Sequence, residues 1–422
     1  MNKHRYQAKE LPGVDWAGVA EVVDGQRVVF GVDVAKADFY GVLMVEGAQV
    51  VTTLTWQHPS ETRTLGGLLA ALPAAGIEVV LEPSGTYGDA VREFLRALGF
   101  GVYLVSPKRV HDAAEVYDGV PSLHDAKAAY LIARLHLAGA SKPWCEVAQA
   151  RREHQALVAE LELYQDAHRR NLNRLEALLS RHWPELGRIA ERNSAGVLYL
   201  LADYGTAQAV CADRAQAEAR LQQARRGAAN PTLVSAILES AQTTLGVPAT
   251  DGERHLLQVL AGELLRTRQA LRGVPRRILE QVNGDPHLPC LGQSFGKATA
   301  RVLEATLGSP LDDPNPHADL KAMGLNLKER SSGQHQGRLS ITKRGPSRAR
   351  RYLFLSALRL VQRDPVVGAW YRKKVARDGR VPRYNAVVAV MRKLALARWH
   401  VARGQPFDST KLFDLKALGL AA

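Results

Sequence analysis

Cysteine is scarce in this chain: three occur among the 422 residues, at Cys145, Cys211 and Cys290. They are widely spaced and form no Cys-x-x-Cys pair, which excludes a disulfide framework and a cysteine-rich zinc site. Apolar runs of 18 residues are also missing, and the polar amino end is unlike a secretory signal. These absences lead us to expect a cytoplasmic protein without a membrane segment.

Acidic side chains are scarce near the carboxyl end. Residues 321–422 hold 23 Lys and Arg against 5 Asp and Glu, a local balance of +18. The whole chain carries +14, so the first 320 residues together carry −4. Such a concentrated basic part predicts a polyanion partner, and nucleic acid is the commonest one. An anionic membrane surface is the weaker alternative, because the basic stretch lacks the apolar face of an interfacial helix.

The chain has enough apolar material for a folded protein, since 46% of its residues are hydrophobic and 23% are charged. Its length allows two or three domains. We expect residues 1–26 to be an irregular extension. After them, the pattern predicts strands at 28–33, 39–45, 50–56, 77–82 and 102–105, and helices at 61–72, 87–98 and 124–137. Three successive strands followed by alternating helices and strands are typical of a ribonuclease-H-like, or RuvC-like, α/β domain, here residues 27–145.

Residues 146–284 are predicted to be helical. One long helix over about 147–186 carries a seam of mostly apolar residues that step by three and four positions: Leu157, Leu161, Tyr164, His168, Leu172, Leu175 and Leu179. Such a heptad-like seam predicts a coiled-coil arm. The alternative is a long helix that packs within its own domain.

Residues 285–422 form the basic part, which we expect to be mainly helical, with amphipathic basic helices at 348–362 and 385–403. Its most basic run contains Ser331-Ser332-Gly333. A hydroxyl ringed by guanidinium groups suits an attack on a phosphodiester, because arginine can hold the phosphate through two hydrogen bonds. Serine is a weak nucleophile without help, however, and Ser-Ser-Gly is commonly a simple turn. Local sequence leaves both interpretations open.

Three carboxylates occupy positions that suit a metal site. Asp33 ends the first predicted strand, Glu82 ends the fourth, and Asp125 lies at the start of the last helix. In a sheet of this kind the first two would project at one edge, and Asp125 can complete the set. Mg²⁺ prefers such oxygen ligands together with water and substrate phosphate. The alternatives are a turn or cap role for Asp33 and a helix-dipole role for Asp125.

These residues carry a resemblance to insertion-sequence transposases of the IS110 type, the family that also includes the Piv-like DNA invertases. The DEDD motifs of that family are matched by GVDVAK at 31–36, EPSGTY at 82–87 and Asp125-Ala126. Its carboxy-terminal domain is matched by MGL at 323–325, SG at 332–333, SITKRG at 340–345, RRYL at 350–353, MRKLA at 391–395 and GQPFD at 404–408. The resemblance covers roughly residues 27–413.

The resemblance implies a DNA recombinase with a RuvC-like domain and a separate serine-bearing domain joined by a coiled coil. Asp33, Glu82 and Asp125 would hold Mg²⁺. Ser332 would attack a DNA phosphate to give a covalent phosphoserine intermediate, Ser331 being the alternative, while a structured bridge RNA selects the donor and target DNA. We expect nucleic-acid contacts from six basic residues: Arg330, Arg338, Lys343, Arg344, Arg348 and Arg351.

The resemblance also implies assembly and location. Members of this family work as homodimers that pair into tetramers, with an active site assembled between protomers. They act in the bacterial cytoplasm at the nucleoid, without a membrane partner. We carry both properties over as expectations for this chain.

The sequence departs from the family pattern at two places. The third motif usually has two aspartates three residues apart, and here Ser122 stands at the first of them. Asp118 or His124 are the candidate substitutes for the missing carboxylate. The family's Pro-Gly-x-Gly-x-x-Thr-Ala hairpin is also altered: residues 289–292 lack one glycine, and Thr299-Ala300 follows four residues late.

Three other functions compete. A RuvC-type, Mg²⁺-dependent DNA nuclease needs the acidic set but forms no covalent intermediate. A sugar kinase or actin relative needs an Asp-x-Gly-x-Thr phosphate loop, which the sequence after Asp33 lacks. A non-catalytic nucleic-acid-binding protein would use the carboxylates only for structure.

Overall fold

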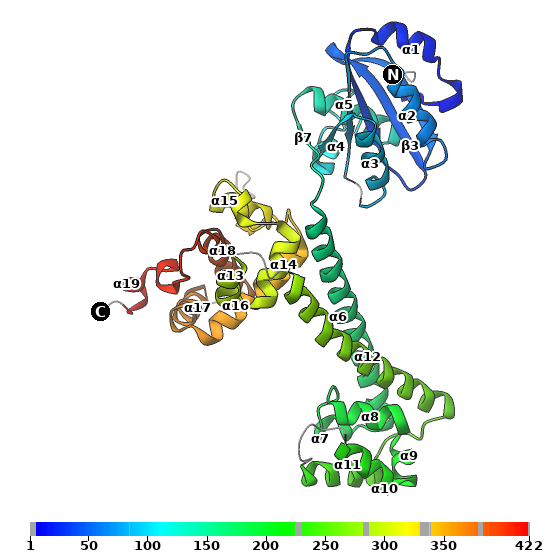
Figure 1. Ribbon diagram of the computed structural model, residues 1–422. Helices are drawn as coiled ribbons and strands as arrows, with labels where there is room; N and C mark the ends of the chain where they lie inside the picture. Colours follow the sequence, from blue (N-terminus) through cyan, green and yellow to red (C-terminus); the bar gives the residue numbers. More distant parts are fainter. Residues whose placement is uncertain are drawn as a thin grey trace. The chain divides into compact units, whose positions relative to one another are not determined.

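The computed structural model describes residues 6–83, 85–223, 230–281, 287–329, 337, 339–378 and 383–420. The chain divides into two compact units, Met1–Glu146 and Val147–Ala422. The division lies one residue from the border at 145 and 146 that the sequence predicts between the α/β domain and the helical region. Both units are drawn in Figure 1.

Unit 1 contains a seven-stranded mixed sheet with the order β1-β4-β3-β2-β5-β6-β7. The strands β2, β3 and β4 are antiparallel neighbours, β5 and β6 run parallel to β2, and β7 is antiparallel to β6. The five predicted strands end within one residue of the observed ones. Their bounds are β1 Lys9–Glu10, β2 Arg27–Asp33, β3 Asp38–Val45, β4 Gln49–Gln57, β5 Gly76–Leu81, β6 Gly101–Val105 and β7 Ser141–Pro143.

Helices cover both faces of this sheet (Figure 1). Val28, Phe30 and Val32 of β2 point to one face, where they share a buried cluster with side chains from α2 and α3. The alternate residue Val29 points to the other face, against α5. The helices are α1 Trp16–Val23, α2 Thr62–Ala70, α3 Asp89–Ala97, α4 Pro107–Asp112 and α5 Asp125–Leu137, with short 3-10 helices η2 Leu11–Gly13 and η3 Glu46–Ala48.

The expectation that residues 1–26 are irregular is wrong. Two of these residues form β1, which pairs with β4, and α1 follows with Val19 and Val23 buried in the main core. The side chain of Asp15 caps α1 by accepting a hydrogen bond from the amide of Gly18 at 3.1 Å. Residues 6–26 form regular elements because their few apolar side chains are buried by the sheet, which periodicity over so short a stretch does not reveal.

The helix α5 lies unusually close to the central strand β2. A Cβ atom on Gly31 would lie 2.5 Å from the carbonyl oxygen of Ala129, so no side chain larger than hydrogen fits there. Ala129 and Ala133 present small side chains to the sheet, and both are fully buried. The first residue of α5 is thereby brought toward the carboxyl end of β2.

Unit 2 contains two long helices that run side by side, α6 Gln149–His182 and α12 Asp251–Gln281 (Figure 1). Leu161 of α6 packs in one cluster with Val274 of α12, and Leu175 packs in another with Leu264, so the two helices are antiparallel. His168 is also satisfied within this pair, since its Nδ1 lies 2.8 Å from the hydroxyl of Thr267. The predicted seam therefore packs within the chain, as in the alternative interpretation, and the coiled-coil arm stays a prediction.

Short helices gather at one end of this pair: α7 Leu186–Ile189, α8 Ala195–Tyr204, α9 Ala207–Ala212, α10 Arg214–Gln223 and α11 Pro231–Thr243. They share one core with the last turns of α6. None of the described helices is both long enough and apolar enough to span a bilayer.

The basic part of unit 2 is a helical cluster with one short ribbon. Its elements are α13 Leu288–Phe295, α14 Lys297–Leu307, η4 Pro310–Asp312, α15 Pro316–Ala322, β8 Leu327–Lys328, β9 Ser340–Ile341, α16 Ser347–Arg363, α17 Pro365–Asp378, α18 Arg383–Ala402, η5 Ser409–Leu412 and α19 Leu415–Leu418. Leu303, Leu353 and Leu394 lie in its core. The buried Arg398 of α18 joins Asp319 of α15 at 2.5 Å, which fixes these helices together.

Candidate active-site residues

Asp33 and Glu82 lie at the same edge of the sheet in unit 1. Asp33 is the last residue of β2, and Glu82 follows β5 directly. The two strands are parallel neighbours in which Val32 pairs with Leu81, so the next residue of each strand reaches the same edge. Both carboxylates are half-buried.

Asp125 completes this group as the first residue of α5. The preceding residue, His124, caps the helix, because its Nδ1 accepts a hydrogen bond from the amide of Lys127 at 3.4 Å. The contact of α5 with Gly31 then sets how near Asp125 comes to Asp33. We call Asp33, Glu82 and Asp125 the acidic edge.

The acidic edge is electrostatically unfavourable when no cation neutralises it. Burial raises the pKa of Asp33 to about 6, and the negative charges of Asp125 and Glu82 add to this, while the amide of Val34 opposes it. Burial also raises the pKa of Glu82. Within the described residues, no three His, Cys, Asp or Glu side chains are close enough to form a ready metal cluster. The three carboxylates therefore influence one another at this edge without forming a preformed metal-binding cluster.

The predicted nucleophile lies outside the described residues, as do Arg330 and Arg338. Ser332 falls between the two strands of the ribbon, β8 and β9, whose pairs are Leu327 with Ile341 and Lys328 with Ser340. Thr342 and Asn326 form a further pair next to the ribbon. The backbone amide of Thr342 donates to the backbone carbonyl of Asn326 at 2.9 Å, and its hydroxyl donates to Oδ1 of the same asparagine at 2.6 Å. The described residues therefore hold both ends of the serine-bearing segment together.

A tight crossing of two backbone segments supports this ribbon. The amide of Lys343 donates to the carbonyl of Gly324 at 2.9 Å, and a Cβ on Gly324 would lie 2.6 Å from the amide nitrogen of Arg344. A Cβ on Gly345 would press on the carbonyl oxygen of Ala322. Lys343 itself has a φ of 56°, a conformation that costs free energy for a residue with a side chain.

Arg350, which the sequence did not single out for this purpose, stabilises the crossing. Its Nη1 donates to the carbonyl of Gly345 at 2.7 Å and to that of Met323 at 3.2 Å. The sequence could have indicated this role, because Arg350 follows Pro346 by four residues and so lies one helical turn into α16.

The other predicted DNA-contacting residues fall into two groups. Lys343, Arg344 and Arg351 are exposed, as a phosphate contact requires. Arg348 is partly buried instead and forms an ion pair with Glu162 of α6 at 2.6 Å. Its guanidinium is already engaged within the protein.

Comparison with known families shows to which family the acidic edge and the basic part of unit 2 belong. Residues 30–184 match the family model of the DEDD transposases of IS110 elements, which is described as Transposase. Residues 293–372 match a second model, Transposase IS116/IS110/IS902 family. The chain belongs to the IS110 family of transposases. No curated protein matches the chain.

Membership makes the protein an enzyme that recombines DNA, and its DEDD group implies both a RuvC-like domain and a divalent metal ion. The acidic edge has the donor chemistry for such an ion, although its side chains do not form a preformed cluster. Its donors are carboxylate oxygens alone, which suit a hard divalent cation. The burial of Asp33 and Glu82, and the repulsion of Asp33 by the other two carboxylates, are the features that a bound cation would relieve.

Asp118 is not free to replace the carboxylate that this transposase lacks at Ser122. Its Oδ1 accepts hydrogen bonds from the ammonium of Lys127 at 2.9 Å and from the amide of Val120 at 3.0 Å. Its Oδ2 accepts one from the hydroxyl of Tyr6 at 3.1 Å. His124 is likewise engaged, as the helix cap. Both candidate substitutes therefore have structural roles.

The stretch that the sequence analysis compared with the family's hairpin does not form a hairpin at residues 289–292. Residues 289–292 are helical, inside α13, and the break comes at Gly296, whose φ is 90°. Gly296 precedes Thr299 by three residues, which is the spacing between the second glycine and the threonine of the hairpin motif. A left-handed glycine between two helices was the missed signal.

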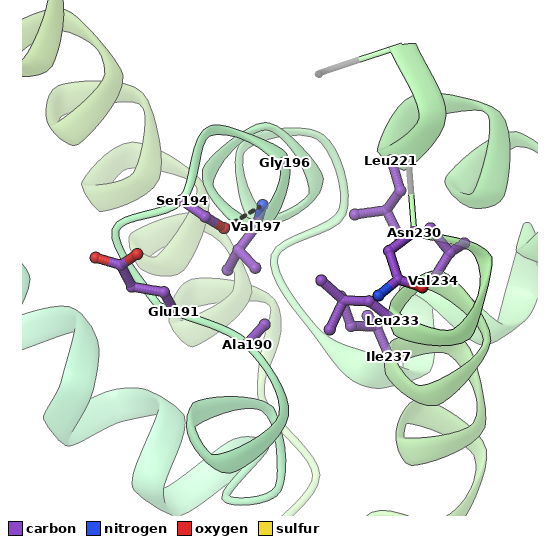
Figure 2. Close-up of a pocket in the computed structure, with 10 residues that line it drawn as sticks. All are labelled: Ala190, Glu191, Ser194, Gly196, Val197, Leu221, Asn230, Leu233, Val234 and Ile237. Carbon is purple, nitrogen blue, oxygen red and sulfur yellow. Dashed lines mark hydrogen bonds between the residues drawn. The ribbon is translucent and has the colours of Figure 1, made fainter. Parts of the chain in front are cut away.

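A separate hollow between the short helices of unit 2 is not a candidate (Figure 2). It encloses about 120 Å³ and is lined mostly by apolar side chains, among them Val197, Leu221 and Ile237. The hydroxyl of Ser194 accepts a hydrogen bond from the amide of Val197 at 3.4 Å and thus caps α8. No lining residue of this hollow is a cation, so it is poorly suited to a phosphate.

Proposed function

We propose that this transposase cuts and rejoins DNA at the ends of its insertion element and at the target through a covalent bond between Ser332 and a DNA phosphate. The observation that carries the proposal is the convergence of Asp33, Glu82 and Asp125 at one sheet edge, in a chain whose basic part matches the family's second domain. Magnesium held by these carboxylates would stabilise negative charge on the scissile phosphate.

The chemistry is a transesterification. The hydroxyl oxygen of Ser332 forms a bond to phosphorus while the bond from phosphorus to one deoxyribose oxygen breaks, and the serine proton passes in net terms to that leaving oxygen. No water or oxidant is consumed, so the reverse attack by a DNA hydroxyl rejoins the strand and releases serine. Exposed Lys343 and Arg344 would hold the phosphate.

Chain length allows Ser332 to reach these cations. Ser332 follows Lys328 by four residues, and four residues of fully extended chain span at most about 14 Å. Lys328 is paired in the ribbon with Ser340, three residues before Lys343. A phosphate bound by Lys343 is therefore within reach of the hydroxyl.

We propose further that a structured bridge RNA selects the DNA sites, and that homodimers pair into tetramers in which one active site uses residues of two protomers. The family resemblance supports both points, and the charge of +18 over residues 321–422 suits two nucleic acids.

The test is to incubate the full chain with element ends, target DNA, guide RNA and Mg²⁺, then denature it and look for a protein–DNA adduct. We expect an adduct with the unaltered chain that is lost in Ser332→Ala and in Asp33→Asn. Ser180→Ala, an exposed serine of α6, is the matched control and should keep it. Adduct lost in Ser331→Ala but kept in Ser332→Ala would move the nucleophile by one residue. Cleavage without adduct in every variant would favour the RuvC-type nuclease.

A further inference from the structure

A cationic hollow lies beside the ribbon of unit 2. It has a volume of about 570 Å³ and lies between the ribbon, α17 and α18. Its lining residues are Leu327, Lys328, Leu339, Ser340, Ile341, Lys343, Lys374, Tyr384, Asn385, Val388, Ala389 and Arg392. Four of them are cations and none is acidic, so the hollow as a whole attracts an anion.

The walls of this hollow also present exposed apolar side chains. Leu339 is 59% exposed and Tyr384 is 58% exposed, although both have large apolar side chains. One side of the Tyr384 ring is supported by Phe354, with ring centres 5.3 Å apart and planes inclined by 33°. A supported, exposed aromatic ring among cations is the combination with which proteins bind unpaired nucleic-acid bases.

The helix α18 contributes polar side chains to the hollow, Asn385 and Arg392. Asn385, Val388, Ala389 and Arg392 follow the spacing of one helix face, so all four face the hollow. The amide of Asn385 can both donate to and accept from the edge of a base. The guanidinium of Arg392 is held in place by a hydrogen bond from Nε to the carbonyl of Leu325 at 2.9 Å.

We propose that this hollow binds one unpaired nucleotide of the DNA substrate next to the scissile phosphate. The base stacks on Tyr384, and the flanking phosphates contact Lys328, Lys343 and Lys374. A paired base cannot offer its face to a ring in a hollow, so the nucleotide must be unstacked. The proposal rests on the proposed function, since it names what the DNA-cutting domain holds beside the reacting bond.

The experiment measures binding alone, in the presence of EDTA. The full chain is titrated against a fluorescein-labelled oligothymidylate and against an abasic oligomer of the same length. We expect the thymidylate to bind about tenfold more tightly, as base–aromatic stacking allows. Tyr384→Ala should remove most of that preference, whereas Tyr384→Phe should keep it.

Two controls make the result specific. Leu355 is also an exposed apolar residue, but it lies on α16 and does not line the hollow. Leu355→Ala should therefore leave the preference unchanged. Lys374→Gln should weaken both oligomers equally and reduce the salt dependence of binding by about one counterion.

A Tyr384→Ala protein that is folded and retains the full preference would overturn the proposal. Tighter binding of oligouridylate with the same dependence on Tyr384 would also overturn it, in favour of an RNA nucleotide. Because no metal or cleavage is involved, this binding measurement does not depend on the covalent step. Loss of the covalent adduct with an intact base preference would count against the proposed function alone.

Discussion

The ammonium of Lys127 lies 2.9 Å from Oδ1 of Asp118, and its side chain is only 2% exposed. The same nitrogen donates to the carbonyl of Val120 at 2.7 Å. A buried ammonium needs such partners, because desolvation otherwise disfavours its charge. Asp118 is thus the counter-ion of a core lysine two residues after Asp125, and the acidic edge has to work without it.

The first prediction follows from this pair. Asp118→Asn should lower the thermal midpoint by several degrees, since Lys127 loses its counter-ion, while leaving the stabilisation by Mg²⁺ unchanged. The hydrogen bond from Lys127 holds the pKa of Asp118 below its usual range. The stability it contributes is therefore present above the ordinary carboxyl pKa and is lost as the pH falls below it. Asp112→Asn, in an exposed pair with Lys108, is the control and should change the midpoint little. A loss of Mg²⁺ response in Asp118→Asn would make it a ligand after all.

The second prediction concerns the missing carboxylate. Ser122 is exposed on the segment that leads into α5. Ser122→Asp should increase the affinity for Mg²⁺ severalfold, because the added charge restores the usual family motif. Isothermal titration with Mg²⁺ measures this directly. Ser122→Asn adds a similar volume without charge and should have no effect, so equal gains in both variants would refute the electrostatic explanation.

The third prediction is a pH dependence of stability at the acidic edge. The pKa of Asp33 is raised to about 6 in the folded protein, so without divalent ions the folded state binds the proton more tightly than the unfolded state. Stability must then fall as the pH rises from about 4 to 6. Asp33→Asn should remove this fall, on the order of 2 kcal/mol, and should also abolish the stabilisation that Mg²⁺ gives the unaltered chain at pH 8.

Melting curves with and without Mg²⁺ across this pH range test that expectation. Asp24→Asn, at the exposed end of α1, should follow the unaltered chain. Parallel pH profiles of Asp33→Asn and the unaltered chain would show that Asp33 does not carry the shifted pKa.

The fourth prediction concerns the crossing below the ribbon. Gly345→Ala would press a methyl group onto the backbone carbonyl of Ala322, which cannot move like a side chain. We expect a destabilisation of about 2 kcal/mol and loss of the covalent adduct. Gly262→Ala is the control, because its Cβ would meet no atom within 4 Å inside α12, and it should be neutral or slightly stabilising. Normal stability and activity of Gly345→Ala would show that the crossing tolerates expansion.

The fifth prediction tests the assembly of one active site from two protomers. Asp33→Asn and Ser332→Ala proteins should each give no adduct, but a mixture of the two that is allowed to exchange subunits should give one. The adduct must then be on the Asp33→Asn chain, which keeps its serine, and a size difference between the two chains identifies it. No adduct in the mixture would mean that each chain supplies both groups itself.

The sequence was informative where structure is local or follows one pattern. Short runs of β-branched and apolar residues located β2 and β5 to within a residue, and their parallel pairing then placed Asp33 and Glu82 at one edge. The long helix α6 was equally readable, because its seam is continuous. The long helix depends on residues that are close in sequence, and the position of the two carboxylates depends only on the strand order of the sheet.

Contacts between segments that are distant in the sequence could not be predicted from it. The pairing of β1 with β4, the short strand β7 and the burial of α1 depend on surfaces that only the folded sheet creates. The engagement of Asp118 by Lys127 and of Arg348 by Glu162 shows the same limit for charges, since sequence alone does not reveal which charge has a partner. Tyr384 and Tyr352 look alike in sequence, yet the first is exposed and the second is only 5% exposed.

The close approach at Gly31 has one more consequence. The spacing between Asp33 and Asp125 is set by two main chains in contact, not by side chains that can choose other rotamers. Core residues elsewhere in the sheet can therefore exchange for others of similar size without changing the dimensions of the acidic edge. Its geometry is inherited from the backbone, so related chains can diverge widely around it while still accommodating an ion of the same size.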